Sequence, residues 1–286
     1  MSGAVTIVAY AVQEARRRRI FLIVLLLTLG FLGLYGLGVD QVMDVAEPEI
    51  AAEGPLDVDV EMVIGATLLG LAMFATFFLG TVLAIFFTLG VVRGDAERGL
   101  LQPLVVRPVG RSTVLLARFF GAAIFCALYV VGVFGAAYAI TGWLTGWWPD
   151  RFVAPALELA AAVALLAALS LLGSVFLSAT ANGIAVFMVF GAGLMAGFLG
   201  QIGEALGSET LSDVATVASW ALPFEALYQD ALARLTIEST GLERFFVQLG
   251  PFGGAEAHGP GLFGWAAVYL VIVGAAALAA FARRDL

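Results

Sequence analysis

Long apolar stretches alternate with short polar ones along the whole chain, and this pattern predicts a bundle of membrane-spanning helices. Six stretches are long and apolar enough to cross a bilayer, which requires about 20 residues of helix. They cover residues 20–39, 62–92, 119–140, 159–179, 183–202 and 262–282. We therefore expect an all-α integral membrane protein in which residues 1–286 form a single transmembrane domain.

Shorter amphipathic patterns lie outside these spans. Residues 1–19 carry apolar side chains at helical spacing, which predicts an N-terminal interfacial helix. Before the last span, residues 224–235 and 242–249 show the same spacing and predict two outer helices that lie on, or dip into, the outer leaflet. Pro223 is well placed to begin the first of these. The pattern leaves open whether the outer helices gate the bundle or only cover its surface.

Lengths and small residues refine this picture. A helix over residues 62–92 would be about 46 Å long, against a hydrocarbon core of about 30 Å, so we expect it to overshoot the bilayer or to tilt. The fourth and fifth spans are separated only by residues 180–182, which predicts an antiparallel hairpin. Gly193 and Gly197 have the spacing of a close-packing motif and are a weak indication of a dimer seam.

Composition and charge set the class and the orientation. The chain is 62% hydrophobic and 13% charged, whereas a soluble domain carries about 25% charge, so a soluble protein is excluded. If the Arg cluster at residues 16–19 is cytoplasmic, the inner side holds 11 Arg and four acids, and the outer side holds three Arg and 18 acids. These net charges of +7 and -15 follow the positive-inside rule and predict a multi-pass protein of the cell membrane with both termini cytoplasmic.

Several kinds of chemistry are excluded or weakened by the residues present. The chain contains no lysine, so it cannot hold a standard phosphate-binding P-loop. Its single histidine, His258, and single cysteine, Cys126, exclude a Cys/His zinc site within one chain. Near the span ends, Arg118 and Glu158 are expected to reach the interface, which weakens a proton-coupled mechanism. The acidic segment at residues 40–61 is expected to be a solvated loop without calcium-binding spacing.

The inner segment between the second and third spans, residues 93–111, is the most distinctive part of the sequence. Charged residues flank a short apolar patch, and Pro103 and Pro108 limit any helix there to a short piece. An ordinary connector needs neither feature. We therefore expect this segment to be a docking surface for a cytoplasmic partner.

Several short residue series along the chain resemble those of the permease subunits of the ABC-2 class of ATP-binding-cassette transporters. This group includes the permease of the nitrous-oxide-reductase maturation system. The resemblance rests on the Arg-rich start, the inner series Glu97, Gly99, Leu104, Arg107-Pro108-Val109 and Arg111, the entry Leu116-Ala117-Arg118, and residues 222–228 and 281–286. It extends over nearly the whole chain.

The resemblance implies an exporter permease that dimerises, as a homodimer or a heterodimer, and rests on two separate ATPase subunits. ATP and magnesium would then belong to the partner, and this chain would hold no cofactor, metal or catalytic site. The residues assigned to ATPase coupling are Glu97, Gly99, Leu100, Leu101, Leu104, Arg107, Pro108 and Arg111. Those assigned to an outer gate helix are Pro223, Phe224, Glu225 and Tyr228.

The substrate is not indicated by any of these residues. Besides the lipid bilayer, the expected partners are proteins, and no nucleic acid is expected. Two other function classes stay open from the sequence: a secondary transporter or channel, and an intramembrane enzyme.

Overall fold

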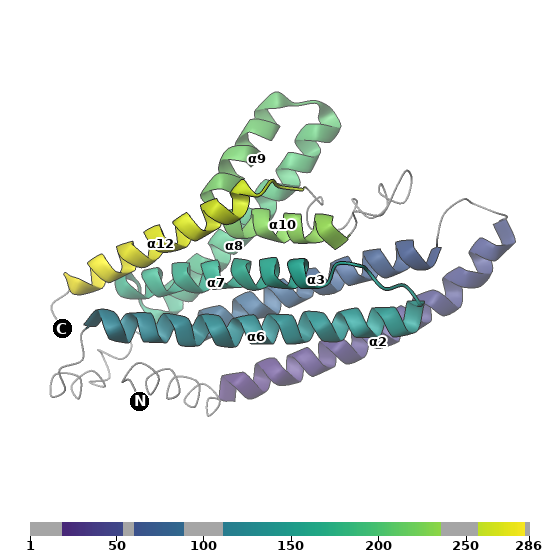
Figure 1. The fold of residues 1–286 in the computed structure, drawn as a ribbon, viewed down its shortest axis with the longest axis horizontal. Coiled ribbons are helices and arrows are strands. Elements are labelled where there is room, and N and C mark those ends of the chain that lie inside the picture. Colours follow the sequence, from purple (N-terminus) through teal and green to yellow (C-terminus); the bar gives the residue numbers. More distant parts are fainter. Residues whose placement is uncertain (1–18, 54–59, 89–110, 236–256, 284–286) are drawn as a thin grey trace.

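The computed structural model describes residues 19–53, 60–88, 111–235 and 257–283 (Figure 1). Within these ranges every regular element is an α-helix. The helices are α2 (Arg19–Glu53), α3 (Val60–Thr88), α6 (Arg111–Thr145), α7 (Val153–Phe176), α8 (Ala179–Leu206), α9 (Glu209–Ala221), α10 (Pro223–Leu235) and α12 (Gly261–Ala282).

Six of these helices are long and apolar enough to span a membrane, which confirms the predicted number of spans. They are α2, α3, α6, α7, α8 and α12. Figure 1 shows that α2 begins and α12 ends at the same end of the bundle. We call this the proximal end, and we call the opposite end, where α6 ends and α7 begins, the distal end. The N-terminal interfacial helix and the second outer helix, predicted at residues 1–19 and 242–249, fall outside the described residues apart from Arg19.

Several helices extend beyond the predicted apolar stretches. Helix α2 continues through the acidic segment to Glu53, so the expectation of a loop over residues 40–53 is wrong. Apolar side chains show which part of a helix lies in hydrocarbon, but they do not show where the helix ends. A helix continues until residues that disfavour it, such as the Gly54-Pro55 pair that follows Glu53 in the sequence. Helix α3 has 29 residues, or about 43 Å of rise, and is therefore longer than a bilayer core as expected. Its predicted last turn lies outside the described residues.

The turn between α7 and α8 differs from the predicted one. It falls at Leu177 and Ser178, and α8 already begins at Ala179. The Ser178 hydroxyl accepts a hydrogen bond from the Ala181 N–H at 3.4 Å, as a residue that precedes a helix commonly does. Asn182, predicted to lie in the turn, is a fully buried residue of α8.

Helix α7 is the centre of the bundle. Two thirds of its span, 67%, is buried, compared with 17% for α2 and for α12. It contacts α3, α6, α8, α10 and α12. By contrast, α8 leaves the bundle at an angle and α9 folds back along it (Figure 1). This divergence opens the space that α10 fills.

Candidate functional site

The segment predicted to contact an ATPase lies almost wholly outside the described residues. Glu97, Gly99, Leu100, Leu101, Leu104, Arg107 and Pro108 fall within residues 89–110, and Arg111 is the first residue of α6. The structure does describe the helices on both sides of the segment. Helix α3 ends at Thr88, and α6 begins at the proximal end (Figure 1).

A buried polar cluster ties the end of α3 to α7 and α8. The hydroxyls of Thr88 and Ser170 are hydrogen-bonded at 2.6 Å, and the Asn182 amide donates to the Ser170 carbonyl at 2.9 Å. All three side chains are at most 1% exposed. Because an unpaired polar group in apolar surroundings is costly, these bonds hold the three helices together. Thr88, the last described residue before the predicted coupling segment, is therefore fixed to the core.

Helix α10, which carries the predicted gate residues, is re-entrant. At its start, Phe224 packs against Phe77 of α3, with ring centroids 6.5 Å apart, and against Gly193 of α8. Both partners lie in the interior of long helices. At its last turn, Arg234 pairs with Glu158 in the second turn of α7. Since α7 begins at the distal end, α10 starts deep in the bundle and runs back out to that end.

The burial of α10 distinguishes the two predicted positions, on the outer leaflet or dipping into it. The helix exists and begins at Pro223 as predicted, but 12 of its 13 residues are buried, and Arg234 is the exception. The gate residues Phe224 and Glu225 are at most 2% exposed, and Tyr228 stacks on Phe77 with ring centroids 5.2 Å apart. A helix lying on the membrane surface would expose its polar side. Here that side faces other helices, which agrees with the expectation of a helix that dips in and disagrees with a helix that lies on the surface.

The two glycines predicted to indicate a dimer seam contact α10 within the same chain. A Cβ atom at Gly193 would lie 2.7 Å from the Phe224 ring, and one at Gly197 would overlap the Glu225 carboxylate and the Gln229 amide. The Gln229 amide in turn donates a hydrogen bond to Glu225. Close packing at these glycines is thus confirmed, but their face is occupied by α10 and is not available to a second copy.

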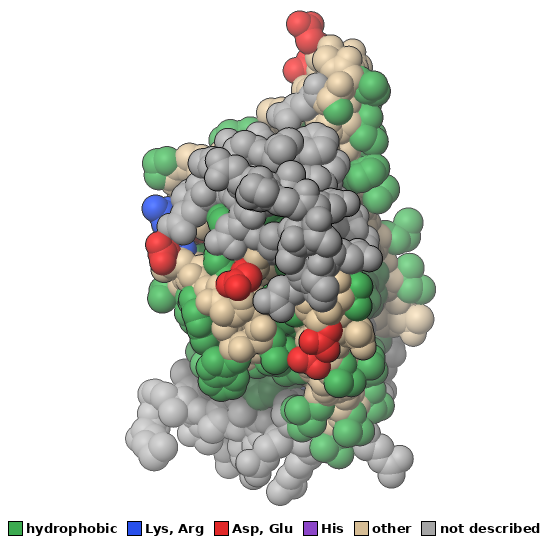
Figure 2. Space-filling view, turned by 90° about the vertical axis from the view of Figure 1, so that its right-hand side faces the viewer, with side chains coloured by type: hydrophobic (Ala, Val, Ile, Leu, Met, Phe, Trp, Pro, Cys, Tyr) green, Lys and Arg blue, Asp and Glu red, His purple; other side chains and the backbone are tan. Residues whose placement is uncertain are grey.

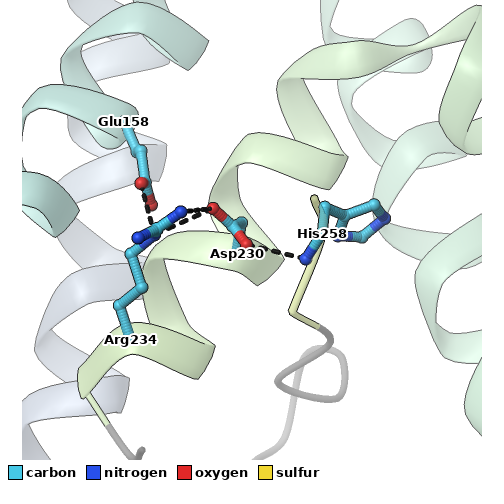
Figure 3. Close-up of polar contacts among 4 residues, drawn as sticks. All are labelled: Glu158, Asp230, Arg234 and His258. Carbon is cyan, nitrogen blue, oxygen red and sulfur yellow. Dashed lines mark hydrogen bonds and ion pairs between the residues drawn. The ribbon is translucent and has the colours of Figure 1, made fainter. Parts of the chain in front are cut away.

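A charged network joins α10 to α7 and to the segment that precedes α12 (Figure 3). The Arg234 guanidinium donates from Nε to Asp230 Oδ2 at 2.9 Å, and its Nη2 lies 2.8 Å from the same oxygen. The other Asp230 oxygen accepts the His258 backbone N–H at 2.7 Å. Arg234 Nε also lies 2.6 Å from Glu158 Oε1. Its single hydrogen is directed at Asp230, so the contact with Glu158 is an ion pair.

This network corrects the prediction for Glu158. That side chain is 2% exposed, so other parts of the chain cover it and it is not open to solvent. Asp230 is 1% exposed, and Arg234, at 25%, provides the compensating charge. Although burial opposes the charge of Arg234, the hydrogen bond to Asp230 and the nearby Glu158 hold its pKa above the ordinary value. Two carboxylates and one permanent cation therefore share one buried site.

The sequence carries a signal for this network. Asp230 and Arg234 are oppositely charged at i, i+4 spacing on one helix, which favours a pair. Glu158 is the one ionisable residue between Phe152 and Phe176. A carboxylate inside an otherwise uncharged span calls for a partner on another helix.

The distal end carries acidic side chains at several places (Figure 2). The exposed acids among the described residues there are Asp40, Asp44, Glu61, Asp150, Glu209 and Asp213, beside the exposed base Arg151. At the proximal end, Arg118 is partly exposed and Arg283 is exposed. This distribution agrees with the charge separation on which the predicted topology rests.

Comparison with curated proteins finds no match to this chain. The sequence model of a family described as ABC-2 family transporter protein matches residues 6–286. The match supports the family at large, whereas the narrower resemblance to the permease of the nitrous-oxide-reductase maturation system is not supported by it. Six spanning helices and a match over nearly its whole length lead to one conclusion: the chain belongs to the ABC-2 family of transporter proteins.

Proposed function

We propose that the chain is the permease subunit of an ABC exporter and works as a dimer with separate ATPase subunits. The observation that carries this proposal is the family match over residues 6–286. The sequence adds that ATP must be hydrolysed elsewhere, since a chain without lysine cannot hold a standard P-loop. The substrate crosses the cell membrane at the expense of ATP bound by the partner.

One observation favours the alternative of a secondary transporter. Buried ionisable groups such as Glu158 and Asp230 are characteristic of proton-coupled and ion-coupled carriers. The two proposals differ in their energy source. Transport into vesicles that stops when ATP is withdrawn, with the proton gradient left intact, supports the exporter; transport that follows the gradient alone supports the carrier.

Within the exporter, we assign residues 94–111 as the element that couples the ATPase to the spans. Leu100, Leu101 and Leu104 are its apolar contacts, Glu97, Arg107 and Arg111 its charged contacts, Gly99 lies between Arg98 and the apolar patch, and Pro108 sets its exit. The described structure supports this assignment indirectly. Before the segment, the described part of α3 ends in the Thr88–Ser170–Asn182 cluster, whose hydrogen bonds join α3 to α7 and α8.

The decisive experiment uses the double variant Leu101→Ala/Leu104→Ala. A minority of interface residues, those at its buried centre, cost more than about 1 kcal/mol each when truncated. We place both leucines in that class, so the double variant should bind the ATPase at least about tenfold more weakly. Arg111→Ala should act more mildly and with a stronger dependence on salt. The measurements are pull-down of the ATPase and its rate of hydrolysis with the permease in vesicles.

A matched control is Glu49→Ala, which alters the acidic segment of α2 and should leave both measurements unchanged. Wild-type pull-down and hydrolysis for the double Leu variant would remove residues 94–111 from the coupling role.

A further inference from the structure

A cavity of about 370 Å³ lies between α8, α9, α10 and the segment that leads into α12. Its size is within the range of small-molecule sites. The lining residues used below are Ser212, Thr216, Trp220, Glu225, Gln229 and Trp265. Helix α9, whose residues are all at least partly exposed, forms one wall, and the buried side of α10 forms the wall opposite.

Several polar groups of this cavity are hydrogen-bond acceptors. Glu225, 2% exposed, contributes a carboxylate that already accepts the Gln229 amide hydrogen, and the Gln229 amide oxygen is a further acceptor. The Thr216 hydroxyl donates its hydrogen to the Ser212 carbonyl at 2.8 Å, so its oxygen can only accept. A site rich in acceptors favours a ligand that donates.

The charge of the lining residues also favours a ligand that donates hydrogen bonds, and in particular a cation. Neither lysine nor arginine occurs among the described residues that line the cavity, whereas Glu225 supplies a negative charge. The Arg234 guanidinium is directed at Asp230 and Glu158 (Figure 3). His258 also lines the cavity, and its imidazole is directed away from Asp230 (Figure 3). A cavity with low-dielectric walls and a carboxylate attracts cations.

Two tryptophans complete the site. The rings of Trp220 and Trp265 lie 5.8 Å apart at 58°, and the Trp265 Nε1–H donates to the Trp220 carbonyl at 2.8 Å. This bond fixes Trp265 and uses its one donor, so what the ring offers a ligand is its π face. Tryptophan is the preferred aromatic partner of ammonium groups.

From these four features we propose that the cavity binds an organic ammonium group. Glu225 pairs with the positive charge, Thr216 and Gln229 accept hydrogen bonds, and the two indoles contact the carbon atoms next to the nitrogen. The same chemistry is presented by the ethanolamine headgroup of a lipid and by a soluble protonated amine. Binding requires neither nucleotide nor a second subunit, so it can be tested separately from the exporter proposal.

The test uses the purified full chain in dodecyl maltoside, a detergent without nitrogen, and isothermal titration calorimetry. The soluble probe is benzylammonium, with benzyl alcohol as its uncharged analogue. The lipid probe is lysophosphatidylethanolamine, with lysophosphatidylglycerol as the headgroup lacking an ammonium. We expect one saturable site per chain and at least about tenfold weaker binding of the uncharged or ammonium-free analogue.

Two variants and one control localise the binding. Glu225→Gln should abolish the preference for the ammonium, and Glu209→Gln, at the exposed start of α9, should retain it. Thr216→Phe should fill the cavity and weaken the binding of both ammonium probes at least about tenfold. Thr216 is exposed and its hydroxyl bonds only its own helix, so this variant should fold.

The proposal is supported if either ammonium probe binds saturably and more tightly than its analogue without the ammonium. The probe that does so shows whether the ligand is a soluble amine or a lipid headgroup. The proposal is overturned if neither ammonium probe binds or if both analogues bind equally well. A folded Glu225→Gln variant that keeps the preference also overturns it. Should that variant fail to fold, unchanged binding by Thr216→Phe has the same effect.

Discussion

The packing of α10 on α8 predicts opposite outcomes for two glycines that are separated by one residue. A Cβ atom at Gly193 would lie 2.7 and 2.8 Å from two atoms of the Phe224 ring, whereas one at Gly191 would meet nothing within 4 Å. Carbon atoms pack at about 3.5 to 4 Å, so Gly193→Ala requires the ring to move by about 1 Å. Phe224 is fully buried and contacts Phe77, which leaves it no free space.

Overpacking of this kind costs about 1 to 3 kcal/mol. We therefore expect Gly193→Ala to lower the free energy of unfolding by that amount and Gly191→Ala to leave it unchanged or slightly raised. The assay is reversible unfolding in mixed micelles of dodecyl maltoside and sodium dodecyl sulfate, repeated over a range of protein concentrations.

A dimer seam at Gly193 would give a loss that varies with protein concentration, because dissociation would then precede unfolding. Our assignment gives a loss independent of concentration. Equal stability of the two variants, or a concentration-dependent difference, would refute the packing of α10 on α8.

Three further predictions concern charge, topology and energy. Arg234→Met leaves the buried carboxylates of Glu158 and Asp230 without a compensating charge. Loss of one partner of a buried pair costs about 3 to 5 kcal/mol, and we expect a value in the lower part of this range because Arg234 is partly exposed. In the same unfolding assay, adding Glu158→Gln should recover part of the loss, and wild-type stability of Arg234→Met would contradict the network. In a Cys126→Ala background, Thr240→Cys should react with an impermeant maleimide from outside the cell, and labelling solely from the cytoplasmic side would reverse the topology. The purified chain alone should neither hydrolyse ATP nor bind it tightly, because it lacks the lysine of a P-loop. Either activity would show that the chain has a nucleotide site of another kind.

Hydropathy was sufficient to predict the number of spans but not their ends. Burial in hydrocarbon requires apolar side chains, so each span is visible as a stretch without charge. The ends of α2 and α6 lie well beyond those stretches because a helix needs only its backbone bonds to continue into water. Similarly, the turn before α8 was predicted at residues 180–182 because asparagine is common in turns. In the structure, Asn182 lies inside α8, where its amide finds a buried partner in Ser170.

The arrangement of the site depends on contacts between distant segments, which one sequence does not show. The start of α10 at Pro223 was predicted from local chemistry, but its re-entry depends on the glycine face of α8. Helix α9 was missed although its sequence is amphipathic, and all of its residues are at least partly exposed. A signal did exist, namely Ser208 followed by Glu209, which is typical of a helix start.

The deep start of α10 has an electrostatic consequence. The first turn of a helix carries a partial positive charge from its unpaired N–H groups, and this charge is normally solvated. Pro223 removes one such N–H, and the N–H of Glu225 is bonded to the Leu222 carbonyl at 3.1 Å. Glu225 lies in the first turn, at the positive end of the dipole, and Arg234 lies in the last turn, at the negative end. Helix α10 thus brings its own counterions at both termini, and any displacement along its axis would carry both charges with it.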